Sequence, residues 1–222
     1  MTFYALWSEY KTIRLFNEKG ELNTFEIYEN ESFTLPLLND ITGYKFFGWY
    51  DNDSYNGNSY SVINFAESNT DFYAKWGLID YNISFISNSN EQINSITYTI
   101  EDECTLPNAK KDNYVFNGWC FKEDLSDEPI NKIEKGSTEN IMLYAKFTPE
   151  NKTIVLNPNG GEIANDKVDV LYDDNYVLPI PELDGYLFAG WYYNDTKLTD
   201  DEGKSLLSYT YDNKSIEAIA KY

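Results

Sequence analysis

The sequence of 222 residues contains no histidine and only two cysteines. Without these side chains the chain cannot assemble a His/Cys metal cluster, a structural zinc site, or a nucleophile activated by histidine. Carboxylates are abundant, but in so acidic a chain a given Asp or Glu is usually a solvated surface group, and no pair suited to glycoside hydrolysis stands out. We therefore expect no enzymatic activity, no cofactor and no metal.

Basic residues and long apolar runs are also scarce. Lys and Arg number 17 against 37 Asp and Glu, which gives a formal net charge of −20. Such a chain repels nucleic-acid phosphates and anionic lipid headgroups. No stretch approaches the roughly 18 apolar residues that span a bilayer, and MTFYALWSEY lacks the features of a signal peptide. We expect neither nucleic-acid binding nor membrane insertion by this chain, although its hydrophobic content of 42% suffices for packed cores.

The segment DNDSYNG at 51–57 begins like a calcium-binding loop. However, Tyr55 occupies the third ligand position, the glycine comes one place late, and no Glu closes the loop at the twelfth position. The segment is better interpreted as a polar turn.

Three short motifs recur along the chain. Gly-Trp occurs at 48–49, 118–119 and 190–191, and Leu-Pro at 35–36, 106–107 and 178–179. A related closing strand, FYAKW, LYAKF or AIAKY, ends at Trp76, Phe147 and Tyr222. The common period of 70 to 72 residues predicts tandem modules at 11–76, 77–147 and 148–222. FYALW, ending at Trp7, makes 1–10 the tail of a preceding repeat, so we expect a fragment of a longer array.

Within each copy the sequence predicts short strands. An alternating run opens each copy and should place three pairs on a buried face, namely Ile13 and Leu15, Ile83 and Phe85, and Ile154 and Leu156. A turn and a second run complete a hairpin, and Leu-Pro then ends regular pairing because proline lacks an N–H donor. The linkers 8–10, 77–80 and 148–151 contain little Gly or Ser, so we expect a fairly stiff rod.

The most regular motif reads GYKFFGWY at 43–50, NYVFNGWC at 113–120 and GYLFAGWY at 185–192. Strict alternation puts its Tyr, Phe and Gly on one face, which predicts nearly full burial of Phe46, Phe116 and Phe188. The tryptophans then fall on the opposite, variable face. There they either cap the edge of the core or form a flat platform for a sugar or peptide, which makes Trp49, Trp119 and Trp191 candidate ligand contacts.

Two positions of this motif have a backbone interpretation. Gly43, Asn113 and Gly185 share the entry position, which predicts a turn with positive φ because Gly and Asn tolerate it best. The recurring Gly48, Gly118 and Gly190 indicate a β-bulge or a neighbour too close for a β-carbon.

The two cysteines occupy positions that are aromatic in the other copies. Aligned on Leu-Pro, Cys104 takes the place of Phe33 and Tyr176, and aligned on Gly-Trp, Cys120 takes the place of Tyr50 and Tyr192. One explanation is that the two positions touch, so that Cys104 and Cys120 form a disulfide or a thiol pair. The other is that two small apolar fillers arose independently.

A hairpin with an Asn-Gly-Gly turn, a Leu-Pro, a Gly-Tyr-x-Phe-x-Gly-Trp-Tyr motif and a closing Leu-Tyr-Ala-Lys-Trp resembles the Listeria-Bacteroides repeat, the B-repeat of internalin-type bacterial surface proteins. The resemblance covers three copies and the tail of a fourth, and the middle copy departs from it at Asn113, Cys120 and the hairpin turn. It implies a β-rich α+β fold of three tandem small β-grasp-like modules in an elongated array. It also implies an extracellular protein, secreted or displayed on a bacterial cell surface, with a part in cell adhesion and virulence. The family has no known catalytic residues, so none are carried over.

Two functions stay open at this point. The first is a non-catalytic stalk or spacer of an adhesin-like protein, in which the repeated motif holds each module together and the partners are neighbouring repeats. The alternative is a binding array that engages a host protein or glycan through the Trp face or the variable segments 51–71, 121–141 and 193–216. The 20 tyrosines of the chain would suit such a surface.

Overall fold

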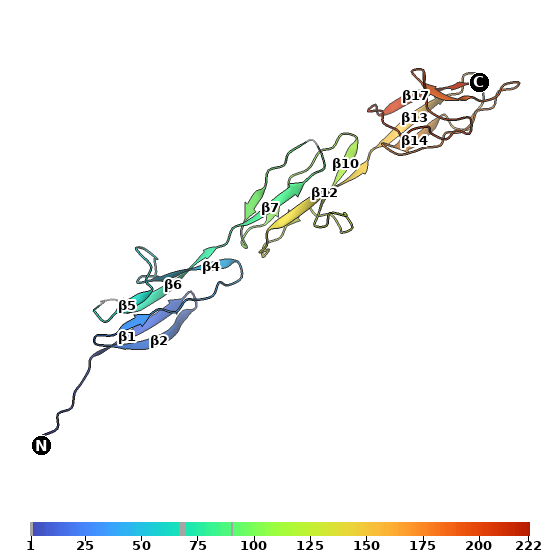
Figure 1. Cartoon of the computed structure of the whole chain (residues 1–222). Helices are drawn as coiled ribbons and strands as arrows, with labels where there is room; N and C mark the ends of the chain where they lie inside the picture. Colours follow the sequence, from blue (N-terminus) through green and yellow to red (C-terminus); the bar gives the residue numbers. More distant parts are fainter. Residues whose placement is uncertain (1, 67–69, 90) are drawn as a thin grey trace. The chain divides into compact units, whose positions relative to one another are not determined.

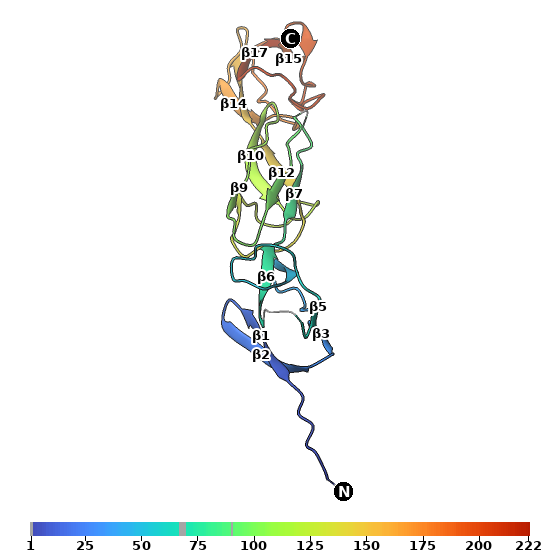
Figure 2. The ribbon, with the colours of Figure 1, turned by 90° about the vertical axis from the view of Figure 1, so that its left-hand side faces the viewer.

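A computed structural model describes residues 2–66, 70–89 and 91–222. Every regular element in these residues is a β-strand, and neither view of the ribbon contains a helix (Figures 1 and 2). The described residues accordingly include no helix of the length and hydropathy needed to cross a membrane. The chain divides into two compact units, one of Met1–Ile83, Ile96–Cys104 and Lys132–Ile141 and the other of Ser84–Ser95, Thr105–Asn131 and Met142–Tyr222. The middle repeat contributes to both units.

The first repeat forms a four-stranded sheet in the order β2-β1-β6-β4. Its strands are β1 (Tyr10–Asn17), β2 (Gly20–Tyr28), β4 (Tyr44–Tyr50) and β6 (Asp71–Leu78). β1 and β2 form the predicted antiparallel hairpin, β6 lies parallel to β1, and β4 pairs antiparallel with β6. A smaller sheet pairs β3 (Ser32–Thr34) with β5 (Val62–Asn64). The predicted core residues Ile13 and Leu15 are both buried.

The other two repeats keep this order of strands. The middle repeat has the order β10-β12-β7-β8, and its strands are β7 (Tyr81–Ile86), β8 (Ile96–Tyr98), β10 (Tyr114–Cys120) and β12 (Ile141–Pro149), with a small sheet of β9 (Cys104–Thr105) and β11 (Lys132–Ile133). The third has the order β14-β13-β17-β15-β16, and its strands are β13 (Asn151–Asn157), β14 (Lys167–Leu171), β15 (Gly190–Tyr193), β16 (Thr196–Lys197) and β17 (Ser215–Lys221). The opening and closing strands of each copy are therefore neighbours inside the sheet. Ile83, Ile154 and Leu156 are buried as predicted, whereas Phe85 is only half-buried.

The all-β structure of the described residues shows that the expected α+β class is wrong. A β-grasp domain packs a helix across its sheet, but the corresponding segment 29–43 is extended and contains only β3 and an isolated bridge at Ile41. Proline accounts for this, because Pro36 has no N–H for a helical hydrogen bond and holds Leu35 in an extended conformation. Leu35 in this extended segment fills part of the core that a helix would otherwise cover. Its counterparts Leu106 and Leu178 are buried as well.

A β-bulge interrupts the pairing of the repeated motif with the closing strand. Phe46 pairs with Trp76 and Gly48 with Lys75, so that Phe47 bulges out of the ladder, and the register shifts between Phe116 and Gly118 as well. The φ angles of Gly48, Gly118 and Gly190 are 120°, 128° and 134°. A β-carbon on Gly118 would lie 2.9 Å from the Ile130 carbonyl oxygen, and one on Gly190 would lie 2.6 Å from that of Thr199. Both predicted reasons for the recurring glycine are confirmed.

The bulge reverses the alternation of side chains beyond it. In the first two copies the Phe and Trp of the motif therefore point to the same side of the sheet. In all three copies the two rings meet edge-on, with centroids 5.7, 5.5 and 5.8 Å apart. The tryptophans take the buried place, with exposures of 2%, 0% and 0%. Phe46, Phe116 and Phe188 are only half-buried, so the expectation that they are nearly fully buried is wrong.

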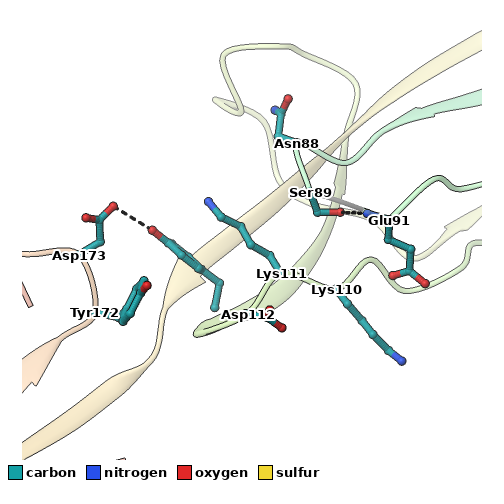
Figure 3. Close-up of a pocket in the computed structure, with 9 residues that line it drawn as sticks. Asn88, Ser89, Glu91, Lys110, Lys111, Asp112, Tyr172 and Asp173 are labelled. Atoms are coloured by element: carbon teal, nitrogen blue, oxygen red, sulfur yellow. Dashed lines mark hydrogen bonds between the residues drawn. The ribbon is translucent and has the colours of Figure 1, made fainter. Parts of the chain in front are cut away.

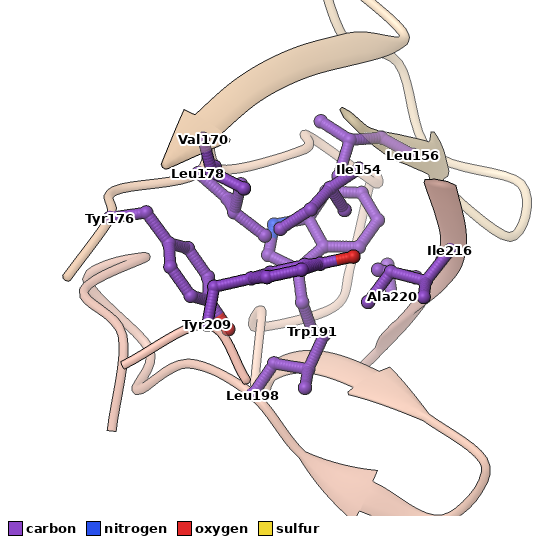
Figure 4. Packing of buried hydrophobic residues seen from close by; sticks show 11 residues of the cluster. Ile154, Leu156, Val170, Tyr176, Leu178, Trp191, Leu198, Tyr209, Ile216 and Ala220 are labelled. Carbon is purple, nitrogen blue, oxygen red and sulfur yellow. The ribbon is translucent and has the colours of Figure 1, made fainter. Parts of the chain in front are cut away.

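The third repeat packs its core around Trp191 (Figure 4). Leu178, Ile154 and Tyr209 surround the indole ring. Tyr209 is fully buried and Tyr176 nearly so, and their rings meet edge-on at 6.2 Å. Burial disfavours the charged phenolate and raises the pKa of Tyr176 and of Tyr209 from 10.0 to about 12.

We expect Gly118→Ala to destabilise the middle repeat by more than Gly136→Ala does. Both substitutions place alanine at positive φ, which costs about 1–3 kcal/mol. Only at position 118 must the methyl group also displace the Ile130 carbonyl, because no described atom lies within 4 Å of an ideal β-carbon on Gly136. Denaturant unfolding followed by circular dichroism measures the difference. Equal losses in the two variants would show that the close approach at the bulge contributes no free energy.

We expect the third repeat to lose stability at alkaline pH. Tyr176 and Tyr209 are protonated in both the folded and the unfolded chain below about pH 10, where their contribution is fully present. As the pH rises toward 12, the unfolded chain releases these protons while the folded chain retains them, so the free energy of unfolding falls. Urea unfolding at pH values from about 9 to about 11.5 measures this slope. Tyr209→Phe should make the slope shallower, and an unchanged slope would contradict the assignment.

Candidate functional site

The three tryptophans considered as ligand contacts lie in the cores of the repeats. Each indole N–H donates a hydrogen bond to the proline carbonyl of the preceding Leu-Pro, at 2.7 Å for Pro36, 2.7 Å for Pro107 and 2.8 Å for Pro179. A buried indole N–H needs such an acceptor. Because the rings of Trp49, Trp119 and Trp191 are buried, they present no flat face to a sugar or peptide in this structure.

The segment at 51–57 is a polar turn closed by its own side chains. The Asn52 side chain accepts a hydrogen bond from the Asn56 N–H at 3.0 Å and donates one to the Asn56 carbonyl at 2.9 Å. Part of the variable segment 51–71, at positions 67–69, lies outside the described residues. Within the described part of the chain, no three Cys, Asp or Glu side chains gather in a way that suits a metal ion.

Cys104 and Cys120 are both free thiols. Cys104 is half-buried in β9, whereas Cys120 is buried at the end of β10 with its sulfur 3.5 Å from the Asp127 carbonyl oxygen. Burial raises the pKa of both thiols, which keeps them protonated and weakly nucleophilic at neutral pH. The two cysteines belong to different compact units, and their proximity stays a prediction.

A candidate functional site that the sequence reasoning missed lies where the first repeat meets the second, inside one compact unit. The Tyr44 hydroxyl donates a hydrogen bond to the Glu101 carboxylate at 2.7 Å, and this bond raises the pKa of Tyr44. The Ile79 N–H donates to the Gly43 carbonyl at 3.0 Å. Gly43 has a φ of 78°, and a β-carbon there would lie 2.6 Å from the side chain of Ile100. The two repeats are therefore in direct contact at what we call the first joint.

The second joint, between the second and third repeats, lies inside the other compact unit and repeats these contacts. The Tyr114 hydroxyl donates to the Asp173 carboxylate at 3.2 Å, and Figure 3 marks this bond with a dashed line at Asp173. The Glu150 N–H donates to the Asn113 carbonyl at 2.9 Å. Asn113 has a φ of 63°, which confirms the predicted positive φ at this position. Burial, together with the bond to Asp173, raises the pKa of Tyr114.

The second joint also contains a buried cation. Lys152 is 4% exposed, and its ammonium group donates to the Asn113 side-chain oxygen at 2.7 Å and to the Glu150 carboxylate at 3.0 Å. Asn113 donates in turn to the Asp212 carboxylate at 2.9 Å. These partners compensate the buried charge, which would otherwise destabilise the joint strongly.

The hydroxyl donors and carboxylate acceptors occupy equivalent positions in the two joints. Tyr44 and Tyr114 are each the second residue of the repeated motif, and Glu101 and Asp173 each stand five residues before Leu-Pro. The signal in the sequence was the tyrosine itself, which recurs in all three copies. Strict alternation assigned it to the buried face and so concealed its role between repeats.

An open hollow of about 730 Å³ lies beside the second joint (Figure 3). Lys110, Lys111, Asp112 and Asp173 bring charges of both signs to its lining. The Lys111 ammonium group lies 3.8 Å from the centroid of the Tyr114 ring, so this cation–π contact is made within the chain. The mixed lining favours no particular class of ligand.

The model of a known family, described as the Listeria-Bacteroides repeat domain, matches residues 15–75, 81–146 and 153–213. Each range lies inside one of the modules predicted from the period of the sequence.

Two similar curated proteins come from Evansella cellulosilytica. One, described as a Gly-rich membrane protein, is 28% identical over 207 residues, which cover 87% of this chain and 24% of the relative. The other, described as a membrane protein, is 26% identical over 199 residues, which cover 88% of this chain and 30% of the relative. The chain thus spans less than a third of the length of either relative.

We expect oxidation to join Cys104 and Cys120 in one intramolecular disulfide. Mild oxidation of the purified chain, followed by peptide mass mapping without reduction, tests the pairing. The closed loop should stabilise the middle repeat by about 2–4 kcal/mol relative to a Cys104→Ser control treated in the same way. Two free thiols after oxidation, or only disulfide-linked dimers, would contradict the proximity of the two positions.

Proposed function

The chain belongs to the Listeria-Bacteroides repeat family, and from that premise we propose that it is a non-catalytic spacer region of an adhesin-like bacterial protein. The membrane-protein descriptions of the two relatives support a place in the cell envelope. We extend this to the extracellular side, where the array would be displayed on the cell surface or released. A ligand-binding part elsewhere in the protein would then engage the host protein or glycan.

The main support for this proposal is that the recurring residues hold each repeat together and join it to the next repeat. Each recurring Trp is buried and bonded to the proline of its own repeat. The recurring Tyr at two positions, 44 and 114, bonds to the following repeat. A binding array would instead be expected to repeat an exposed set of ligand contacts. The pattern therefore favours a spacer, whose work is to fold and to hold its neighbours.

The charge of the chain agrees with a spacer role. A formal net charge of −20 opposes adsorption to anionic lipid and to nucleic acid, and it discourages association between neighbouring arrays. The charge also favours solvated, mutually repelling repeats over a collapsed assembly.

The spacer proposal predicts an extended particle without ligand affinity of its own. A compact globule of this length would have a radius of gyration of ~17 Å, and small-angle scattering should give a clearly larger value. The labelled chain should also give no saturable binding on an array of glycans and extracellular host proteins. Saturable binding that is lost on replacement of a variable segment such as 121–141 would favour the binding array, and a radius at the compact value would contradict the spacer.

A further inference from the structure

The third repeat carries the donor half of the joint, and the described residues supply no acceptor for the Tyr186 hydroxyl. Gly185 has a φ of 80°, like Gly43 at the first joint, and the Tyr186 N–H donates to the Leu183 carbonyl at 3.0 Å. The equivalent bonds run from the Tyr44 N–H to the Ile41 carbonyl at 2.8 Å and from the Tyr114 N–H to the Lys111 carbonyl at 3.1 Å. The turn is therefore formed in the third repeat before any partner arrives.

The exposure of this turn differs from that of its two counterparts. Gly43 is buried at the first joint, whereas Gly185 is exposed, and no described atom lies within 4 Å of an ideal β-carbon on it. Tyr44 and Tyr114 are half-buried, whereas Tyr186 is 65% exposed. The centroid of its ring lies 6.3 Å from that of Tyr222. A preformed and solvent-exposed copy of a contact surface is what a docking site requires.

We propose that the Gly185-Tyr186 turn is a docking surface for a further repeat of the same family, joined to the chain behind Tyr222. The hydroxyl of Tyr186 donates to a carboxylate five residues before the Leu-Pro of that repeat, and the Gly185 carbonyl accepts an N–H from the segment that joins the two. Both interactions copy the existing joints, where Glu101 and Asp173 supply the carboxylate.

The joining segment explains why the partner is a tethered repeat. At both joints the N–H donor comes three residues after the closing aromatic, since Ile79 follows Trp76 and Glu150 follows Phe147. A tethered partner also acts at a high effective concentration.

A second, free copy of this chain is a poorer partner. It would present Asn30 at the acceptor position, five residues before its first Leu-Pro. The neutral amide oxygen of Asn30 is a weaker acceptor than a carboxylate, which forms charge-assisted hydrogen bonds.

The test appends a second copy of residues 77–147 directly behind Tyr222 of the full chain. This connection places the appended Ile79 three residues after Tyr222 and supplies the Ile100-Glu101 turn, as at the first joint. Amide hydrogen exchange in the joining segment is measured with and without Tyr186→Phe. We expect exchange to be about tenfold faster in the variant, as for the loss of one hydrogen bond to a carboxylate. Glu101→Gln in the appended copy should have a similar effect.

Matched controls separate docking from other effects. Tyr186→Phe in the chain of 222 residues should leave its unfolding unchanged, and Tyr4→Phe, at a tyrosine that is 87% exposed, should change nothing in the extended chain. Exchange in the joining segment that is insensitive to Tyr186→Phe would overturn the proposal. Concentration-dependent dimerisation of the original chain that Tyr186→Phe abolishes would overturn it as well, because the partner would then be a free copy. Neither result bears on ligand binding, so the spacer proposal stands or falls separately.

Discussion

The hydrogen bond from the indole N–H to the proline carbonyl is the constraint on which each repeat depends. Burial of a tryptophan brings a large apolar surface into a small core, but it also requires an acceptor for the N–H. The proline supplies that acceptor because it interrupts regular pairing and leaves its carbonyl free to face the core. Leu-Pro and Gly-Trp are therefore two halves of one interaction, which explains why they keep the same period along the chain.

The alanine of the closing strand also recurs in each repeat, and it packs beside the tryptophan that makes this hydrogen bond. Trp49, Trp119 and Trp191 each pair across the sheet with an alanine, at positions 74, 145 and 220. These alanines are almost fully buried, and their small side chains leave room for the indole. The glycine of the bulge turns the tryptophan toward that space. A larger residue at the alanine, or a β-carbon at the glycine, would disturb the same bond between indole and proline.

Some of the structure follows from the sequence, and some depends on information that a pattern of residues does not contain. The alternation of Ile13 and Leu15 predicts a strand with one buried face, because the pairing of β1 is regular there. Alternation gives the wrong faces for Phe46 and Trp49, because the bulged residue between them reverses the alternation. The position of the bulge depends on how β4 pairs with β6, which the sequence of β4 alone does not specify. The expected α+β class fails for a local reason, since Pro36 and its counterparts disfavour a helix between the hairpin and the repeated motif. The effect of proline could be predicted from the sequence, whereas the α+β class rested only on the resemblance to a known family.

The contacts at the joints could not be predicted from a single copy of the repeat, because each contact pairs residues of two successive copies. Tyr44 and Glu101 are separated by 57 residues, and Tyr114 and Asp173 by 59. The two joints also show how one contact tolerates different surroundings. At the first, Gly43 packs against Ile100, whereas at the second Asn113 accepts from the buried Lys152. Both residues tolerate positive φ, so the backbone of the turn is preserved while its side chain is exchanged. An asparagine at position 43 would meet Ile100, and a glycine at position 113 would remove the side-chain oxygen that Lys152 requires. The turn residue and the surface that it meets are therefore matched within each joint, and this match distinguishes one joint from the other while the tyrosine–carboxylate bond is common to both.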